Sequence, residues 1–195
     1  MIRSENPILS KLFLFSSIFI GCTLAHASEE KMITLFSFTP ETDDAVWTSN
    51  NDGVMGGIST GSARMVADGM EFSGELSLEN SGGFASVYQP VSLDLSDFEG
   101  IRIRVLGDGR TYQLRLESDA LYRDRWPVTF GAEFPTTAGE WTEAFIPFAE
   151  LRQSWRGRSL EGYTFNPADL RRMAIMLADK KPGPFSLKVD RIEAN

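Results

Sequence analysis

Cysteine and histidine are almost absent from this sequence, which has one of each among its 195 residues. Both Cys22 and His26 lie within the first 27 positions. A chain that begins at residue 28 therefore has neither a thiol nor an imidazole. This absence excludes disulfides, cysteine nucleophiles, histidine bases, Ser-His-Asp triads and most zinc or copper sites. Carboxylate pairs, Ser-Lys dyads and hard metal ions held by oxygen ligands are the hydrolytic chemistries that remain.

Long apolar runs are also scarce, and the main one lies at the N-terminus. Arg3 and Lys11 precede an apolar stretch over residues 12–24. After this stretch, Ala25-His26-Ala27 fits a small-x-small cleavage site. These features predict a secretory signal peptide over residues 1–27, cleaved between Ala27 and Ser28. The expected location is the periplasm or the outside of the cell. Residues 19–22 approximate a lipoprotein box, so acylation of Cys22 is the alternative.

The remaining residues 28–195 are enough for one domain with a buried core. Removal of Arg3, Lys11 and Glu5 changes the formal net charge from −8 to −9. An acidic chain lacks the clustered positive charge that phosphate binding needs, which argues against a nucleic-acid partner. The mature chain has no apolar run of membrane-spanning length, so we expect no transmembrane segment in it.

Apolar and polar residues alternate with period two through most of the mature chain. Ile101, Ile103 and Val105 alternate with Arg102 and Arg104, for example. This pattern is typical of antiparallel strands with one buried face. Glycine- and proline-rich turn signals separate the runs. The sequence predicts an all-β fold of about ten strands, a β-sandwich or jelly roll, with short helices only at residues 148–153 and after Asn166.

The segment over residues 47–59 is dense in glycine and predicts a tightly folded loop. One interpretation makes it a partner or ligand surface with exposed backbone amides. The other makes it a structural turn in which Asp52 accepts hydrogen bonds from backbone amides while Trp47 and Met55 plug one end of the sandwich. The candidate residues are Trp47, Asn51, Asp52, Gly53, Met55, Gly56 and Gly57.

The same loop carries a resemblance, together with motifs that follow it in order. Residues 72–76 read Phe-Ser-Gly-Glu-Leu, residues 82–86 read Gly-Gly-Phe-Ala-Ser, and residues 107–110 read Gly-Asp-Gly-Arg. Residues 146–148, Ile-Pro-Phe, and residues 183–185, Gly-Pro-Phe, complete the series. On these motifs the chain resembles the complex I intermediate-associated protein 30 family.

The resemblance implies a galactose-binding-like jelly-roll β-sandwich over residues 28–195, which agrees with the alternation. It also implies a non-catalytic role, without a cofactor, since eukaryotic members act in mitochondria as assembly factors for NADH:ubiquinone oxidoreductase. This chain differs in having a secretory-type signal and no arginine-rich transit peptide.

Two further groups of side chains are candidates for ligand contacts. Arg102, Arg104 and Arg115 are predicted to share an outward sheet face, where they would suit an anionic or carboxylated glycan. Trp126 and Trp155 lie outside the clearest alternating runs and could stack on sugar rings. An outward sheet face neutralised by ion pairs, and packing of the two aromatics within loops, are the simpler interpretations.

Four carboxylates from the middle of the chain could supply ligands for calcium or the acid and base of a glycosidase, but their spacing matches no recognised calcium loop. They are Glu117, Asp119, Asp124 and Glu133. Since an acidic protein must expose carboxylates somewhere, we expect them to be solvated and predict no metal site.

The leading hypothesis is an exported, non-catalytic β-sandwich that binds another protein and assists its assembly. A carbohydrate-binding module of the cell envelope, with or without calcium, is the first alternative. An assembly factor for respiratory complex I is the second, and an enzyme that uses carboxylates alone is the weakest.

Overall fold

The computed structural model describes residue 1, residues 31–39 and residues 46–195. The expected cleavage site at Ala27 and Ser28, with Cys22 and the rest of the expected signal peptide beyond Met1, lies outside these residues. The described chain forms thirteen strands and four short 3-10 turns, and none of its helices is long and apolar enough to cross a membrane.

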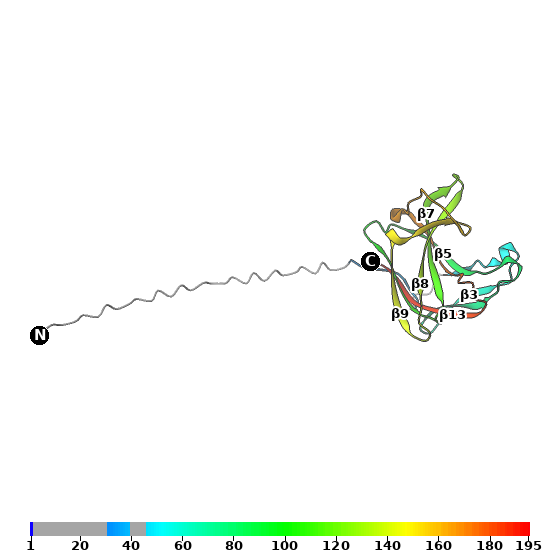
Figure 1. The fold of residues 1–195 in the computed structure, drawn as a ribbon, viewed down its shortest axis with the longest axis horizontal. Helices are drawn as coiled ribbons and strands as arrows, with labels where there is room; N and C mark the ends of the chain where they lie inside the picture. The colour runs from blue at the N-terminus through cyan, green and yellow to red at the C-terminus, as the bar shows by residue number, and fades with distance from the viewer. Residues whose placement is uncertain (2–30, 40–45) are drawn as a thin grey trace.

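The first layer is a six-stranded antiparallel sheet in the order β3-β4-β13-β6-β9, with β1 paired to the C-terminal half of β13. Figure 1 shows the long β13 in red at the C-terminal end of the chain. The strands of this sheet are β1 (Ile33–Ser37), β3 (Thr60–Val66), β4 (Gly69–Leu76), β6 (Gly100–Leu106), β9 (Trp141–Pro147) and β13 (Gly183–Ala194).

The second layer is a seven-stranded antiparallel sheet in the order β11-β10-β8-β7-β12-β5-β2. The chain crosses repeatedly between the two layers, which is the connectivity of a jelly roll. The strands are β2 (Thr48–Ser49), β5 (Ala85–Leu93), β7 (Thr111–Tyr122), β8 (Trp126–Pro135), β10 (Arg152–Trp155), β11 (Arg158–Ser159) and β12 (Leu170–Leu177).

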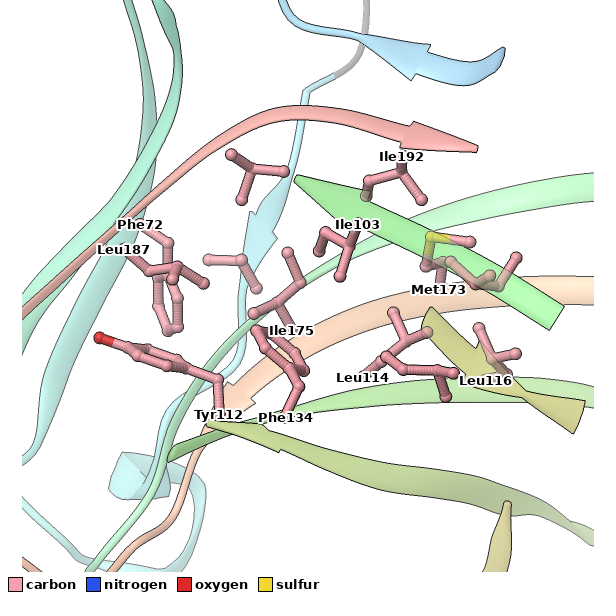
Figure 2. Packing of buried hydrophobic residues seen from close by; sticks show 14 of the residues in the cluster. Phe72, Ile103, Tyr112, Leu114, Leu116, Phe134, Met173, Ile175, Leu187 and Ile192 are labelled. Atoms are coloured by element: carbon pink, nitrogen blue, oxygen red, sulfur yellow. The ribbon is translucent and has the colours of Figure 1, made fainter. Parts of the chain in front are cut away.

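An apolar core fills the space between the sheets. Figure 2 shows side chains of β7 and β12, among them Leu114 and Ile175, pointing toward Ile103 and Ile192 of the opposite sheet. Burial follows the period-two pattern along β6, whose residues 101, 103 and 105 are fully buried while Arg102 and Arg104 face outward. The expected all-β jelly-roll sandwich is therefore confirmed.

The two expected helices are only 3-10 turns. The turns of the described chain are η1 (Asp52–Met55), η2 (Glu79–Ser81), η3 (Phe148–Glu150) and η4 (Pro167–Asp169). The expected helix over residues 148–153 is wrong in its second half, because the chain extends again at Leu151 and β10 pairs with β8 from Arg152 onward. At η4, the Asn166 side chain caps the turn by accepting a hydrogen bond from the amide of Ala168.

Candidate functional site

The glycine-rich segment lies where the chain passes from one sheet to the other. β2 belongs to the seven-stranded sheet and β3 to the six-stranded sheet, so residues 50–59, which we call the motif loop, bridge the two layers. The loop contains η1, which ends at Gly56 with φ at +91°. The segment is thus a tight loop, as the sequence predicts.

Asp52 is the centre of the motif loop. Its carboxylate has no exposed surface and accepts four hydrogen bonds. Ser59 donates from its amide to Oδ1 at 2.9 Å and from its hydroxyl to Oδ2 at 2.5 Å. The amides of Gly83 and Phe84 donate to Oδ2 at 2.6 and 3.2 Å. Because Ser59 leads into β3 and Gly83 leads into β5, this one carboxylate ties the two sheets together.

Asn51 makes a second bridge beside Asp52. Its Nδ2 donates to the carbonyl of Gly61 in β3 at 3.0 Å, and its Oδ1 accepts from the amide of Ser86 in β5 at 3.2 Å. One end of this amide therefore bonds to a strand of the six-stranded sheet and the other end to a strand of the seven-stranded sheet, so Asn51 and Asp52 together fix the base of the loop.

Gly57 is required by this packing. A Cβ on Gly57 would lie 2.4 Å from Cγ of Asp52, which is closer than two carbon atoms can approach. By contrast, a Cβ on Gly53 would meet nothing within 4 Å. The two glycines of the same loop thus have different roles, the first in the packed base and the second at the exposed tip.

The carboxylate of Asp52 stays ionised despite its surroundings. Burial by itself raises the pKa of Asp52, but the Ser59 hydroxyl and three backbone amides stabilise the anion and bring the pKa below its ordinary value of 3.8. The structural role expected of Asp52, an acceptor for backbone amides, is what the geometry shows.

The tip of the motif loop is apolar and exposed. Val54, Met55 and Ile58, which we call the loop tip, are 74%, 60% and 52% exposed. The expectation that Met55 plugs the sandwich is therefore wrong. Trp47 does take that role: it is buried and packs against Phe36 and Phe38, with ring centroids 5.4 and 6.1 Å away.

The three arginines predicted to share a face do not. Arg102 and Arg104 lie on β6 of the six-stranded sheet and Arg115 lies on β7 of the seven-stranded sheet, so they point to opposite sides of the sandwich. Arg102 pairs with Glu143 at 3.0 Å, and Arg104 pairs with Asp190 at 2.6 Å. On β6 the outcome is an outward face with ion pairs.

Trp126 and Trp155 do come together. Their ring centroids lie 5.3 Å apart, and Tyr122 lies 5.1 Å from Trp155. These three half-buried rings, which we call the aromatic cluster, sit where the β7–β8 and β10–β11 hairpins end side by side. The guanidinium groups of Arg123, Arg125 and Arg156 each lie 5.2 or 5.3 Å from the centroid of a ring in the aromatic cluster.

The turns of these two hairpins explain the placement of the arginines. Arg123 and Asp124 have φ of +51° and +53°, and Arg156 and Gly157 have φ of +47° and +74°. Positive φ at both central residues is the signature of a type I′ turn. The Arg156-Gly157 pair was a recognisable signal of such a turn, whereas Arg123-Asp124 was not.

The four candidate carboxylates remain dispersed. Glu117 lies 3.6 Å from Arg172, Asp119 accepts from Asn166 at 3.1 Å, and Glu133 accepts from Gln113 at 3.3 Å. Asp124 is exposed in its turn. Within residues 31–39 and 46–195, no group of three or more carboxylates, histidines or cysteines is arranged to hold a metal ion.

A further cluster unites two of the family motifs. Arg110 donates to both oxygens of Asp179 at 2.7 and 3.0 Å, and also to the carbonyls of Gly183 and Pro184. Both charged side chains are nearly buried. The hydrogen bonds from Arg110 more than offset burial and hold the pKa of Asp179 below its ordinary value. Asp179 was not predicted, because nothing in its local sequence marks it as a partner of Arg110.

Comparison with known proteins finds relatives of this chain. Two curated relatives are a probable mitochondrial complex I intermediate-associated protein 30 of Caenorhabditis briggsae and its counterpart in Mus musculus. Each is 31% identical, over 98 and 106 residues. These matches cover 49% and 52% of this chain but only 29% and 32% of the relatives, so the chain spans about a third or less of their length.

Among solved structures, the fold is similar to that of the family 11 carbohydrate-binding module of a Clostridium thermocellum cellulosomal cellulase. The TM-score is 0.62 at 17% identity, over 86% of this chain and 95% of the module. Residues 36–189, which include the motif loop, most of both sheets and the Arg110 cluster, match the family described as complex I intermediate-associated protein 30. The chain belongs to that family.

Proposed function

We propose that this protein is a non-catalytic, exported binding protein that holds another protein through the loop tip and assists its assembly. The observation that carries the proposal is the contrast within the motif loop. Its base is fixed to both sheets by Asp52 and Asn51, while Val54, Met55 and Ile58 are more than half exposed. Apolar side chains gathered on a protein surface commonly mark a protein interface.

The rigid base supports this role energetically. A loop that must be ordered on binding loses affinity, because the entropy of ordering opposes association. The hydrogen bonds of Asp52 order the motif loop before any partner arrives. Leu78, 42% exposed, adds apolar surface near Gly83, one of the amides that Asp52 binds.

Membership of an assembly-factor family supports a protein partner. The absence of cysteine and histidine after residue 27 supports a role without catalysis. The expected signal peptide supports export, which separates this chain from its mitochondrial relatives. The mass of the mature N-terminus tests export: a start at Ser28 supports it, and a retained leader would favour assembly of respiratory complex I instead.

Affinity capture from the envelope fraction tests the leading proposal. The double variant Val54→Ser/Met55→Ser should capture at least tenfold less of any protein that the wild type captures reproducibly. Its urea midpoint should equal that of the wild type, since both side chains are exposed. Leu121→Ser, on the β7–β8 hairpin and 40% exposed, is the matched control and should retain the partner. Equal capture by the double variant and the wild type would contradict the assignment of the loop tip.

A carbohydrate-binding role is the second candidate, and the aromatic cluster favours it. Trp126, Trp155 and Tyr122 with their three arginines form a surface on which sugar rings could stack. The likeness of the fold to a carbohydrate-binding module adds support.

A glycan array, with and without added Ca²⁺, tests this second candidate. Trp155→Ala should abolish any signal. Trp141→Ala is the control, because Trp141 is an exposed tryptophan on β9 of the other sheet, with Arg104 4.6 Å above its ring. Loss of signal in both variants, or in neither, would argue against the aromatic cluster as the sugar-binding site.

A further inference from the structure

The outer face of the seven-stranded sheet has an arginine at its centre. Arg115 on β7 pairs in register with Gly131 on β8 and with Ala174 on β12. Both neighbours are small, and the side chain of Arg115 rests over Gly131: a Cβ there would lie 3.5 Å from Cγ of Arg115. These three residues form a strip across the centre of this face, with Arg115 in the middle.

Arg115 differs from the paired arginines on the opposite side of the sandwich. Within the described residues its only side-chain hydrogen bond runs from Nη1 to Oε1 of Gln113, at a long 3.4 Å. Among the described residues no carboxylate lies within ion-pair distance of it, whereas Arg102 and Arg104 each have one. Arg115 is half-buried. A guanidinium has five N–H donors, so most of those of Arg115 make no hydrogen bond within the described chain.

A second guanidinium on the same face also has few hydrogen-bond partners. Arg172 on β12 lies 3.7 Å from the centroid of the Tyr88 ring and 3.6 Å from Glu117, too far for a strong hydrogen bond. Its Nε is buried and has no hydrogen-bond partner in the described chain. Glu117 does not serve Arg172 alone, because its Oε1 also accepts a hydrogen bond from the hydroxyl of Thr129 at 3.4 Å.

The electrostatics of the strip favour an incoming anion. Burial lowers the pKa of Arg115, Glu117 opposes this shift, and Arg172 adds to it. This face carries three arginines, Arg115, Arg152 and Arg172, against two carboxylates, Glu117 and Glu133. Positive charge therefore exceeds negative charge on it, although the chain is acidic overall. A ligand carboxylate would offset the desolvation of these charges and supply acceptors for their unused donors.

We propose that this strip binds a uronate, a sugar ring bearing a carboxylate, with the carboxylate held between Arg115 and Arg172. Gly131 and Ala174, on either side of Arg115, have no large side chain to block the apolar face of a sugar ring, and Gln113 and Glu133 on the same face offer hydrogen-bonding groups for hydroxyls. An acidic peptide lacks that rigid, flat face. The proposal rests on the second candidate function and narrows its ligand class.

Calorimetric titration with tri-galacturonate, with neutral galactotriose as the companion probe, tests the site. Tri-galacturonate should bind, its affinity should fall as NaCl rises, and Arg115→Gln should weaken it at least tenfold. Arg104→Gln is the matched control, an outward arginine on the opposite sheet, and should bind as the wild type does. Amide shifts of the wild-type protein should change at Gln113, Gly131 and Ala174, which locates the ligand even if a variant fails to fold.

Each other outcome overturns the proposal in a distinguishable way. Equal binding of the neutral sugar, unaffected by Arg115→Gln, removes the uronate site but leaves carbohydrate binding standing. No binding of either sugar at millimolar concentration, together with a blank glycan array, removes both. Equal binding of poly-glutamate would show that the site selects the carboxylate alone and not a sugar.

Discussion

Ser59 donates two hydrogen bonds to the carboxylate of Asp52, one to each oxygen, across seven residues of the motif loop. The Ser59 hydroxyl also accepts from the amide of Ser77 at 3.0 Å, next to the C-terminal end of β4. The loop is therefore closed on itself at the point where it joins the six-stranded sheet. Amides that lead into β5 complete the shell around Asp52.

Asp52→Asn should destabilise the fold by about 2–3 kcal/mol, because an amide nitrogen replaces one acceptor and faces buried donors. Urea denaturation followed by fluorescence measures this loss. Asp97→Asn is the control: Asp97 is 71% exposed and its partner Lys31 is also exposed, so its midpoint should be nearly unchanged. Equal midpoints for Asp52→Asn and the wild type would show that the buried hydrogen bonds contribute little.

The same residue predicts a pH dependence. The pKa of Asp52 in the folded state is below 3.8, so its stabilising contribution is complete above that pH and is lost as the pH falls through the lower folded-state pKa. The difference in unfolding free energy between the wild type and Asp52→Asn should be large at pH 6 and should shrink below pH 3.8. Urea titrations at pH values between 6 and 2.5 measure it. A difference that stays constant with pH would contradict the ionised state of Asp52.

Gly57→Ala should disrupt the motif loop, since the added methyl group occupies the position of the Asp52 carboxylate. Loss of the Asp52 hydrogen bonds should lower the unfolding free energy by about as much as Asp52→Asn does, roughly 2–3 kcal/mol. Gly53→Ala, in the same loop and with open space around the new methyl group, is the control and should unfold at the wild-type urea concentration. If both variants unfold together, the loop is not packed around Asp52 as described.

Much of this fold could be predicted from the sequence, because the alternation of apolar and polar residues along a strand indicates which side chains are buried. Ile101, Ile103 and Val105 were expected inside and are fully buried. The tight motif loop followed from its glycines and from the acceptor at Asp52. Alternation does not report which sheet a strand joins, however. Arg104 and Arg115 therefore look equivalent in the sequence although they lie on opposite faces.

The sequence also could not predict which residues far apart in the chain come into contact. Met55 and Trp47 are both apolar residues near the same turn, yet only Trp47 meets the rings of β1 and its neighbour Phe38. The uncovered arginine strip depends on residues more than forty positions apart, Arg115 and Arg172, which only strand pairing brings together. The sequence could suggest arginine as an anion ligand but could not choose which arginines lack partners.

Arg110→Gln should cost about 3 kcal/mol, because it leaves the nearly buried Asp179 without its cation and frees the carbonyls of Gly183 and Pro184. Thermal unfolding followed by circular dichroism measures the loss. Arg171→Gln is the matched control, since the Arg171–Asp169 pair is exposed and should shift the melting temperature little. Similar shifts for both variants would mean that the Arg110 cluster behaves as a surface ion pair.

Asp124→Gly should stabilise the protein by roughly 0.5–1 kcal/mol, because Asp124 is held at a φ of +53° that glycine adopts without strain. The turn is closed by the amide of Arg125, which donates to the carbonyl of Tyr122 at 3.3 Å, and this bond needs no side chain at position 124. Arg125→Gly, at the adjacent residue, which does not have positive φ, should instead destabilise by a similar amount. Urea midpoints that move in the same direction for both variants would contradict the left-handed turn that positions Tyr122 and Trp126 in the aromatic cluster.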